Sequence, residues 1–225
     1  PRHDLAREPL PFPEELDFIL GEAGKYLNRQ PTLADVRSMW VGLRPLVKPQ
    51  DDDGENTKKI SREHTVLASK TGLVTVTGGK WTTYRRMAED VIDRAAAIAG
   101  LAPVACPTRT LKLHGSPAQP DGDPYGSDAP LLAELPGRHR LLHPALPYDE
   151  AMVRFAVRHE AARTVEDILA RRTRALFLDA RAAATCIERV AAILGEELSL
   201  PTGQVAAQAE AAWGRSRHFL CCERD

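Results

Sequence analysis

The feature that most constrains this chain is a β-rich run that passes through two glycines into a helical pattern. Leu73 to Thr77 predicts a strand, Gly78 and Gly79 follow it, and apolar residues then recur at helical spacing from Tyr84 to Ile98. A helix N-terminus carries free backbone N–H groups and the positive end of the helix dipole. Glycines before it permit close approach of a ligand. The segment predicts either an anion or cofactor site or a tight structural turn.

Three polar residues follow the glycines at the same place. Lys80 adds a movable positive charge, and Thr82 and Thr83 place hydroxyls where a helix cap is expected. The segment is not the phosphate loop GxxxxGK[ST], because Trp81 follows the lysine. The surrounding pattern therefore identifies a candidate site without specifying its ligand.

Further strands and a helix are expected before this turn. Thr65 to Ala68, followed by a four-residue turn, forms a hairpin signal with the strand at Leu73. The compact apolar run Val36 to Val47 predicts another strand, closed by Arg44-Pro45. Pro11 to Leu27 has helical spacing and acids after Pro13, so it predicts a helix that ends near Asn28.

The second half of the sequence predicts helices alone. A stretch rich in Pro, Gly and Asp from Ala105 to Gly126 places a domain boundary near its start, which gives domains 1–104 and 105–225. We expect helices over 148–162, over 165–172 behind a capping box of Thr164 and Asp167, from Asp179 to Gly195, and over 202–213. The fold class predicted is an α+β fragment followed by an all-helical domain.

Composition excludes several classes of protein. The 30 Lys+Arg and 31 Asp+Glu give a net charge of −1, which argues against nucleic-acid binding. No apolar run approaches the roughly 18 to 20 residues of a membrane span. Four cysteines without CxxC spacing and no signal peptide at the start favour a cytoplasmic protein. Because the chain starts at Pro1 and its first methionine is Met39, we expect a piece of a longer polypeptide.

Arginines and histidines supply the remaining candidates. Arg44 and Arg62 border predicted strands and suit a phosphate or carboxylate, although each could instead pair with a structural acid, Asp35 or Glu63. No metal site is predicted. The acidic turn 51–53 lacks the spacing of a calcium loop, and the pair His139 and His143 is followed at once by proline with no obvious third ligand.

Three motifs in order resemble the C-terminal half of FAD-dependent (aerobic) glycerol-3-phosphate dehydrogenase. They are the stretch Trp40-Val41-Gly42-Leu43-Arg44-Pro45-Leu46, then Ser61-Arg62-Glu63-His64, then Thr77-Gly78-Gly79-Lys80-Trp81-Thr82-Thr83-Tyr84-Arg85. The segment Tyr125-Gly126-Ser127 and the run from His159 to Arg174 resemble the all-helical C-terminal domain of this family. The resemblance extends over nearly the whole chain.

The resemblance implies an FAD-dependent oxidoreductase that converts sn-glycerol 3-phosphate to dihydroxyacetone phosphate and passes electrons to a quinone or to oxygen. It implies that Gly78, Gly79, Lys80, Trp81 and Thr82 line the flavin, that Arg62 and Lys80 hold the substrate phosphate, and that Arg44 lies beside the reacting carbinol. It also implies a peripheral position on the cytoplasmic face of a membrane, and it is compatible with a homodimer.

The GxGxxG fingerprint that holds the FAD pyrophosphate in this family does not occur in the chain, so we expect the chain alone to be catalytically incomplete. Two alternatives stay open. One is another flavin-dependent amine or hydroxy-acid oxidase of the same fold, in which Arg44 would bind a carboxylate. The other is a non-catalytic helical interaction module in which the glycine turn is structural.

Overall fold

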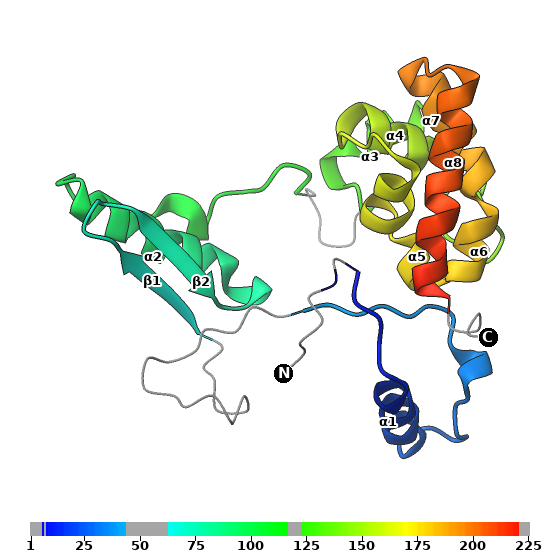
Figure 1. Ribbon diagram of the computed structural model, residues 1–225. Coiled ribbons are helices and arrows are strands. Elements are labelled where there is room, and N and C mark those ends of the chain that lie inside the picture. Colours follow the sequence, from blue (N-terminus) through cyan, green and yellow to red (C-terminus); the bar gives the residue numbers. More distant parts are fainter. Residues whose placement is uncertain (1–5, 7, 44–62, 117–122, 221–225) are drawn as a thin grey trace. The chain divides into compact units, whose positions relative to one another are not determined.

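The structure is a computed structural model that describes residues 6, 8–43, 63–116 and 123–220 (Figure 1). Two short strands and several helices make up the described chain, which confirms the predicted α+β fragment with a helical C-terminal part. None of its helices has the length and apolar character needed to cross a membrane. The elements are α1 (Pro13–Gly24), β1 (His64–Ala68), β2 (Val74–Gly78), α2 (Tyr84–Ile98), α3 (Ala129–Ala133), α4 (Glu150–His159), α5 (Ala175–Leu178), α6 (Ala180–Thr185), α7 (Ile187–Leu198) and α8 (Thr202–Ser216).

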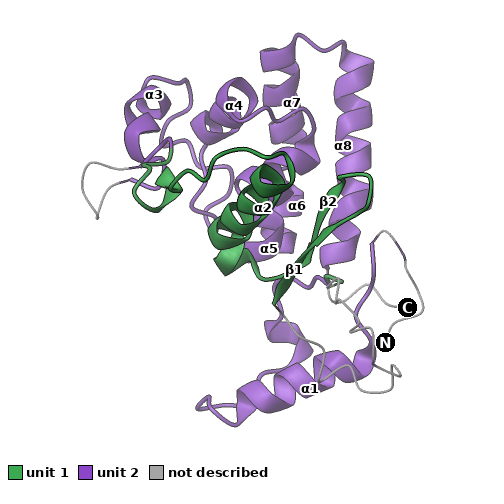
Figure 2. Cartoon of the chain, turned by 90° about the vertical axis from the view of Figure 1, so that its left-hand side faces the viewer, with its two compact units in different colours: residues 1–5, 42–113 green, residues 6–41, 114–225 purple. Residues whose placement is uncertain are grey.

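The described residues fall into two compact units, which Figure 2 shows in different colours. The hairpin unit comprises residues 42–43 and 63–113, and the helical unit comprises residues 6, 8–41, 114–116 and 123–220. The predicted boundary between residues 104 and 105 stays a prediction, because compactness alone does not establish an independently folding domain.

The hairpin unit consists of β1 and β2 with α2 packed on them (Figure 1). The strands are antiparallel, with Val66 opposite Val76 at the centre of the register. Gly72 closes the connecting turn at φ 86°, and its N–H donates to the Ser69 carbonyl at 3.0 Å. The predicted hairpin and the predicted helix after it are therefore confirmed. No described residue of this unit is fully buried.

The helical unit contains the hydrophobic core. Ile168, Ile187 and Leu194 are each completely buried between α4, α7 and the π-helical turn Asp167–Arg172. The predicted capping box before that turn is present, since the Asp167 N–H donates to Thr164 Oγ1 and the Thr164 N–H donates to Asp167 Oδ2, both at 3.0 Å. This core forms because long apolar side chains recur on the inward faces of consecutive helices.

The predicted strand over Val36 to Val47 is wrong for residues 36–43, and the rest of it lies outside the described residues. Residues 36–41 belong to the helical unit instead. The Ala180 N–H donates to the Arg37 carbonyl at 3.1 Å and to Ser38 Oγ at 2.8 Å, and the Met39 N–H donates to the Phe219 carbonyl at 3.0 Å. Trp40 packs edge-on against Phe177, with ring centroids 5.0 Å apart. The apolar run serves packing on helices rather than pairing in a sheet.

The predicted single helix from Asp179 to Gly195 is also wrong. Asp179 does cap a helix, since its Oδ1 accepts from the Ala182 N–H at 3.0 Å, but that helix ends at Thr185 and α7 continues to Leu198. Gly195 lies inside α7, where an added Cβ would approach Val205 of α8 to 2.5 Å. The glycine therefore permits close approach of two helices and does not end one.

Candidate functional site

The candidate site is the turn that joins β2 to α2. Gly78 and Gly79 have φ values of 75° and 82°, a region that residues with a Cβ rarely adopt. A Cβ on Gly79 would lie 2.5 Å from Met87 Sδ and 3.1 Å from the His64 Cβ. The backbone conformation therefore favours glycine at position 79, and a methyl group there would in addition require the Met87 side chain to move.

The predicted helix start at Tyr84 is confirmed, since α2 begins there. A 3-10 turn, Trp81–Thr83, lies between Lys80 and the helix. The Thr83 hydroxyl, which the sequence places as a cap acceptor, instead donates to the Lys80 carbonyl at 3.0 Å. The cap prediction is wrong for Thr83 because a 3-10 turn brings its side chain back over the preceding carbonyl.

Four of the five predicted cofactor residues are joined by this turn on the surface, and the fifth, Gly78, ends the strand before it. Lys80, Trp81 and Thr82 are exposed, and Trp81 has 84 % of its surface open to solvent. The Trp81 ring stacks on Tyr84 at 5.2 Å with the two planes 22° apart. The turn thus presents bare backbone, a cation and a flat aromatic face to whatever binds there.

Charge pairing along α2 distinguishes Lys80 from the nearby arginines. Arg85 pairs with Glu89 at 2.9 Å and Arg86 pairs with Asp90 at 2.9 Å. The hydrogen bond from Arg85 lowers the pKa of Glu89. Among the described residues, no carboxylate forms an ion pair with Lys80. Lys80 is therefore the described cation at this turn whose charge is left for a ligand.

The two predicted substrate arginines, Arg44 and Arg62, lie outside the described residues, so their place at the site stays a prediction. One structural partner considered for them is already occupied. Asp35 accepts from Arg29 Nη1 at 2.9 Å and from Nη2 at 2.5 Å, and these hydrogen bonds lower the pKa of Asp35 strongly.

Of the two histidines considered for a metal site, His143 uses its imidazole, and His139 its main chain, in a local hydrogen bond. His143 Nδ1 accepts from the Ala145 N–H at 3.0 Å, and the His139 N–H donates to Asp149 Oδ2 at 2.9 Å. Within the part of the chain that the structure describes, no three His, Cys, Asp or Glu side chains converge as metal ligands would.

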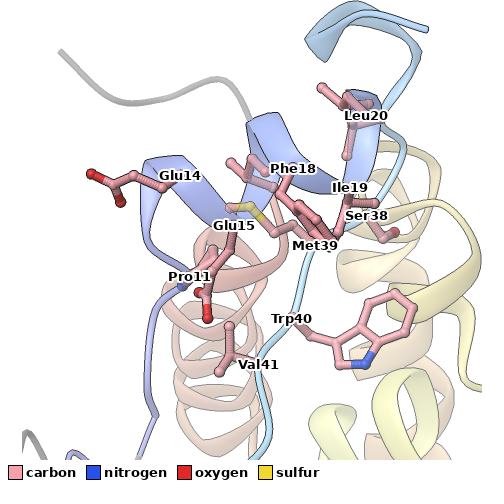
Figure 3. Close-up of a pocket in the computed structure, with 12 residues that line it drawn as sticks. Pro11, Glu14, Glu15, Phe18, Ile19, Leu20, Ser38, Met39, Trp40 and Val41 are labelled. Carbon is pink, nitrogen blue, oxygen red and sulfur yellow. The ribbon is translucent and has the colours of Figure 1, made fainter. Parts of the chain in front are cut away.

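A cavity of about 830 Å³ lies in the helical unit between α1 and residues 36–41 (Figure 3). Its lining is mostly apolar, and the ionisable side chains among the described residues that line it are the carboxylates of Glu14 and Glu15. A dianionic substrate needs cations to replace its hydration, so this cavity does not suit a phosphate ester. The glycine turn remains the better candidate, because Lys80 supplies a cation there.

One feature of the site was not predicted from the sequence. His64 Nε2 lies 2.8 Å from Asp90 Oδ2, which connects the start of β1 to α2 beneath the turn. The two residues are 26 positions apart, and only the strand register, which sets His64 opposite Gly78, shows that they meet.

Comparison with known proteins places these observations in a family context. Residues 69–204 match the family model described as the C-terminal domain of alpha-glycerophosphate oxidase. The chain is 36 % identical to the probable glycerol-3-phosphate dehydrogenase, mitochondrial, of Caenorhabditis elegans, over 93 % of this chain and 33 % of that protein. It is 37 % identical to glycerol-3-phosphate dehydrogenase SDP6, mitochondrial, of Arabidopsis thaliana, over 84 % of this chain and 36 % of that protein. The chain thus spans about a third of the length of these curated relatives.

A solved structure has a similar fold. The glycerol-3-phosphate dehydrogenase from Bacillus halodurans, in its complex with FAD, superimposes with a TM-score of 0.63 at 22 % identity. The match covers 94 % of this chain and 46 % of that one.

Proposed function

The chain belongs to the family of the C-terminal domain of alpha-glycerophosphate oxidase, and from this premise we propose that it is the C-terminal part of an FAD-dependent glycerol-3-phosphate dehydrogenase. The longer polypeptide would oxidise sn-glycerol 3-phosphate to dihydroxyacetone phosphate. The observation that carries the proposal is the turn Gly78-Gly79-Lys80, which presents bare backbone and a cation without an ion-pair partner among the described residues.

The residues of the turn fit a flavin and a phosphate ester. Reduction of a flavin adds negative charge to its pyrimidine edge, and a fixed arrangement of backbone N–H groups and a nearby cation stabilises such charge. Gly78 and Gly79 carry no side chain that would keep the ring system away, and the exposed ammonium of Lys80 suits a phosphate. When bound, FAD supplies the acceptor for the hydride that leaves C2 of the substrate.

The roles of individual residues follow the family resemblance. Lys80 and Arg62 would hold the phosphate, and Arg44 would lie beside the carbinol, so that fixed charges orient C2 before reaction. Gly78, Gly79, Lys80, Trp81 and Thr82 would border the flavin. Of these residues, Gly78 to Thr82 are consecutive and lie in the described part of the chain, whereas Arg44 and Arg62 lie outside it.

The hairpin unit gives a physical reason to expect that the chain alone does not turn over. A two-stranded sheet is marginally stable by itself. Leu67, Leu73 and Leu113 expose 55 %, 66 % and 67 % of their surface, and no described residue of the unit is fully buried. The additional polypeptide found in the relatives would cover such surface and supply the site for the FAD pyrophosphate.

Transfer of electrons to a quinone or to oxygen, a cytoplasmic location, peripheral attachment to a membrane and dimer formation remain predictions. They concern surfaces and partners beyond the glycine turn, and the charge and fold of the described residues support none of them over the others.

The test uses the longer polypeptide that contains this chain together with a flavin-binding part. Dye reduction is followed with glycerol 3-phosphate and with glycerol, which lacks the phosphate. Lys80→Ala should lower kcat/KM for glycerol 3-phosphate by about a hundredfold and lower the rate with glycerol much less, because glycerol has no phosphate for the ammonium to bind. Lys70→Ala, an exposed lysine in the hairpin turn, is the matched control and should have no effect.

Other outcomes decide between the alternatives. A flavin-containing protein that ignores glycerol 3-phosphate but oxidises an amine or a hydroxy acid would replace the substrate proposal. A polypeptide that binds no flavin would favour the non-catalytic interaction module.

A further inference from the structure

A partly buried hydrogen bond lies directly beneath the proposed site. His64 Nε2 and Asp90 Oδ2 are 2.8 Å apart, and their side chains are 20 % and 27 % exposed. The bond joins the first residue of β1 to the second turn of α2. α2 packs on both β1 and β2, and the glycine turn connects β2 to α2.

Asp90 is fixed from two sides. Its Oδ2 faces His64, and its Oδ1 forms an ion pair with Arg86 Nη2 at 2.9 Å. Because an ionised carboxylate only accepts hydrogen bonds, the imidazole Nε2 must carry the donated proton. Asp90 therefore determines both the position of the His64 ring and which ring nitrogen is protonated.

His64 in turn contacts the backbone of the site. In the register of the hairpin it lies opposite Gly78, and its Cβ would be only 3.1 Å from a Cβ built on Gly79. Met87 Sδ also approaches this Cβ position, to 2.5 Å. A movement of His64 away from α2 would therefore release the backbone that leads directly into Lys80.

We propose that His64, held by Asp90, is a positioning residue that fixes the Gly78-Gly79-Lys80 turn for the substrate phosphate. The inference rests on the proposed function, because it assigns the positioned lysine to that substrate. His64 does not touch the reacting atoms in this role. It acts through the turn, so its loss should affect KM more than kcat.

The experiment uses the longer, flavin-containing polypeptide. His64→Ala and Asp90→Ala should each raise KM for glycerol 3-phosphate about tenfold, with flavin content and kcat within about twofold of the unchanged protein. His64→Gln should keep KM near its original value, because the glutamine Nε2 can donate to Asp90 from a similar position. Asp93→Ala, which removes an exposed carboxylate three residues along the same helix, is the matched control.

A second measurement does not depend on turnover. Amide hydrogen exchange over residues 78–83 should become faster in His64→Ala and Asp90→Ala and remain slow in His64→Gln. Unchanged KM and exchange in the two alanine variants would overturn the inference, as would a glutamine variant as impaired as His64→Ala. Failure of the proposed function would appear separately, as an absence of glycerol 3-phosphate oxidation in the unsubstituted polypeptide, and the exchange measurement would still decide whether His64 positions the turn.

Discussion

Replacement of Gly79 by alanine tests the geometry of the site most directly. The φ of 82° at this position costs a residue with a Cβ about 1–2 kcal/mol. The new methyl would also meet Met87 Sδ at 2.5 Å, but Sδ is near the end of a flexible side chain, so its displacement adds at most about 1 kcal/mol. Gly79→Ala should therefore destabilise the hairpin unit by about 1–3 kcal/mol.

The two contributions can be separated by urea unfolding of the longer polypeptide. Unfolding is monitored by the rise in flavin fluorescence when the flavin is released. Met87→Ala in the same chain removes the clash, so the Gly79 substitution should then cost only the backbone share of about 1–2 kcal/mol. Gly21→Ala is the control, because Gly21 lies in α1 with no atom within 4 Å of an added Cβ. A Gly79→Ala protein within about 0.5 kcal/mol of the original would refute the argument that glycine is favoured at the turn.

Three predictions concern the helical unit. Glu197→Ala should cost about 2–3 kcal/mol in urea unfolding, because it leaves Arg154, whose side chain is 12 % exposed, with one fewer partner; the double variant that combines Glu197→Leu with Arg154→Met should restore most of this loss. Burial raises the pKa of Glu160, so the ionised carboxylate weakens the fold at neutral pH. Glu160→Gln should therefore raise Tm at pH 7. This gain should vanish below the ordinary carboxyl pKa of 4.5, where Glu160 is protonated in both the folded and the unfolded protein. Asp179→Ala should cost about 1 kcal/mol in the same unfolding assay through loss of the cap on Ala182, whereas Asp179→Asn should retain it.

The hairpin, α2 and the glycine turn could be predicted because their signals are local. Alternating β-rich residues, a Gly72 turn and a 3.6-residue apolar period each depend on a few neighbouring positions. The strand expected at Val36 to Val47 failed because an apolar run shows that a segment will be covered but not by what. Here Trp40 packs edge-on against Phe177, which lies far later in the sequence, and 55 % of the Trp40 surface stays exposed. Gly195 was misinterpreted for the same reason, since its contact Val205 lies on the next helix.

The candidate site was predicted unevenly for a related reason. Lys80 could be identified from its position after two glycines, but the sequence could not show that Arg85 and Arg86, which follow it closely, are paired with Glu89 and Asp90. Charge available to a ligand depends on which cations are already paired, and helical spacing alone leaves that choice open. The His64 contact needed the strand register as well, which only pairing fixes.

The exposed apolar side chains of the hairpin unit connect the fold to the proposed chemistry. Leu67 and Leu73 belong to the same hairpin that holds the glycine turn, and both are more than half exposed. Covering them with further polypeptide would stabilise β1 and β2 by roughly 25 cal/mol for each Å² of apolar surface removed from water. Lys80 follows the opposite end of β2 from Leu73, so polypeptide that covered the whole length of the hairpin would also exclude water beside Lys80 and strengthen its attraction to a phosphate. Stability of the hairpin and affinity for the substrate would then rise together.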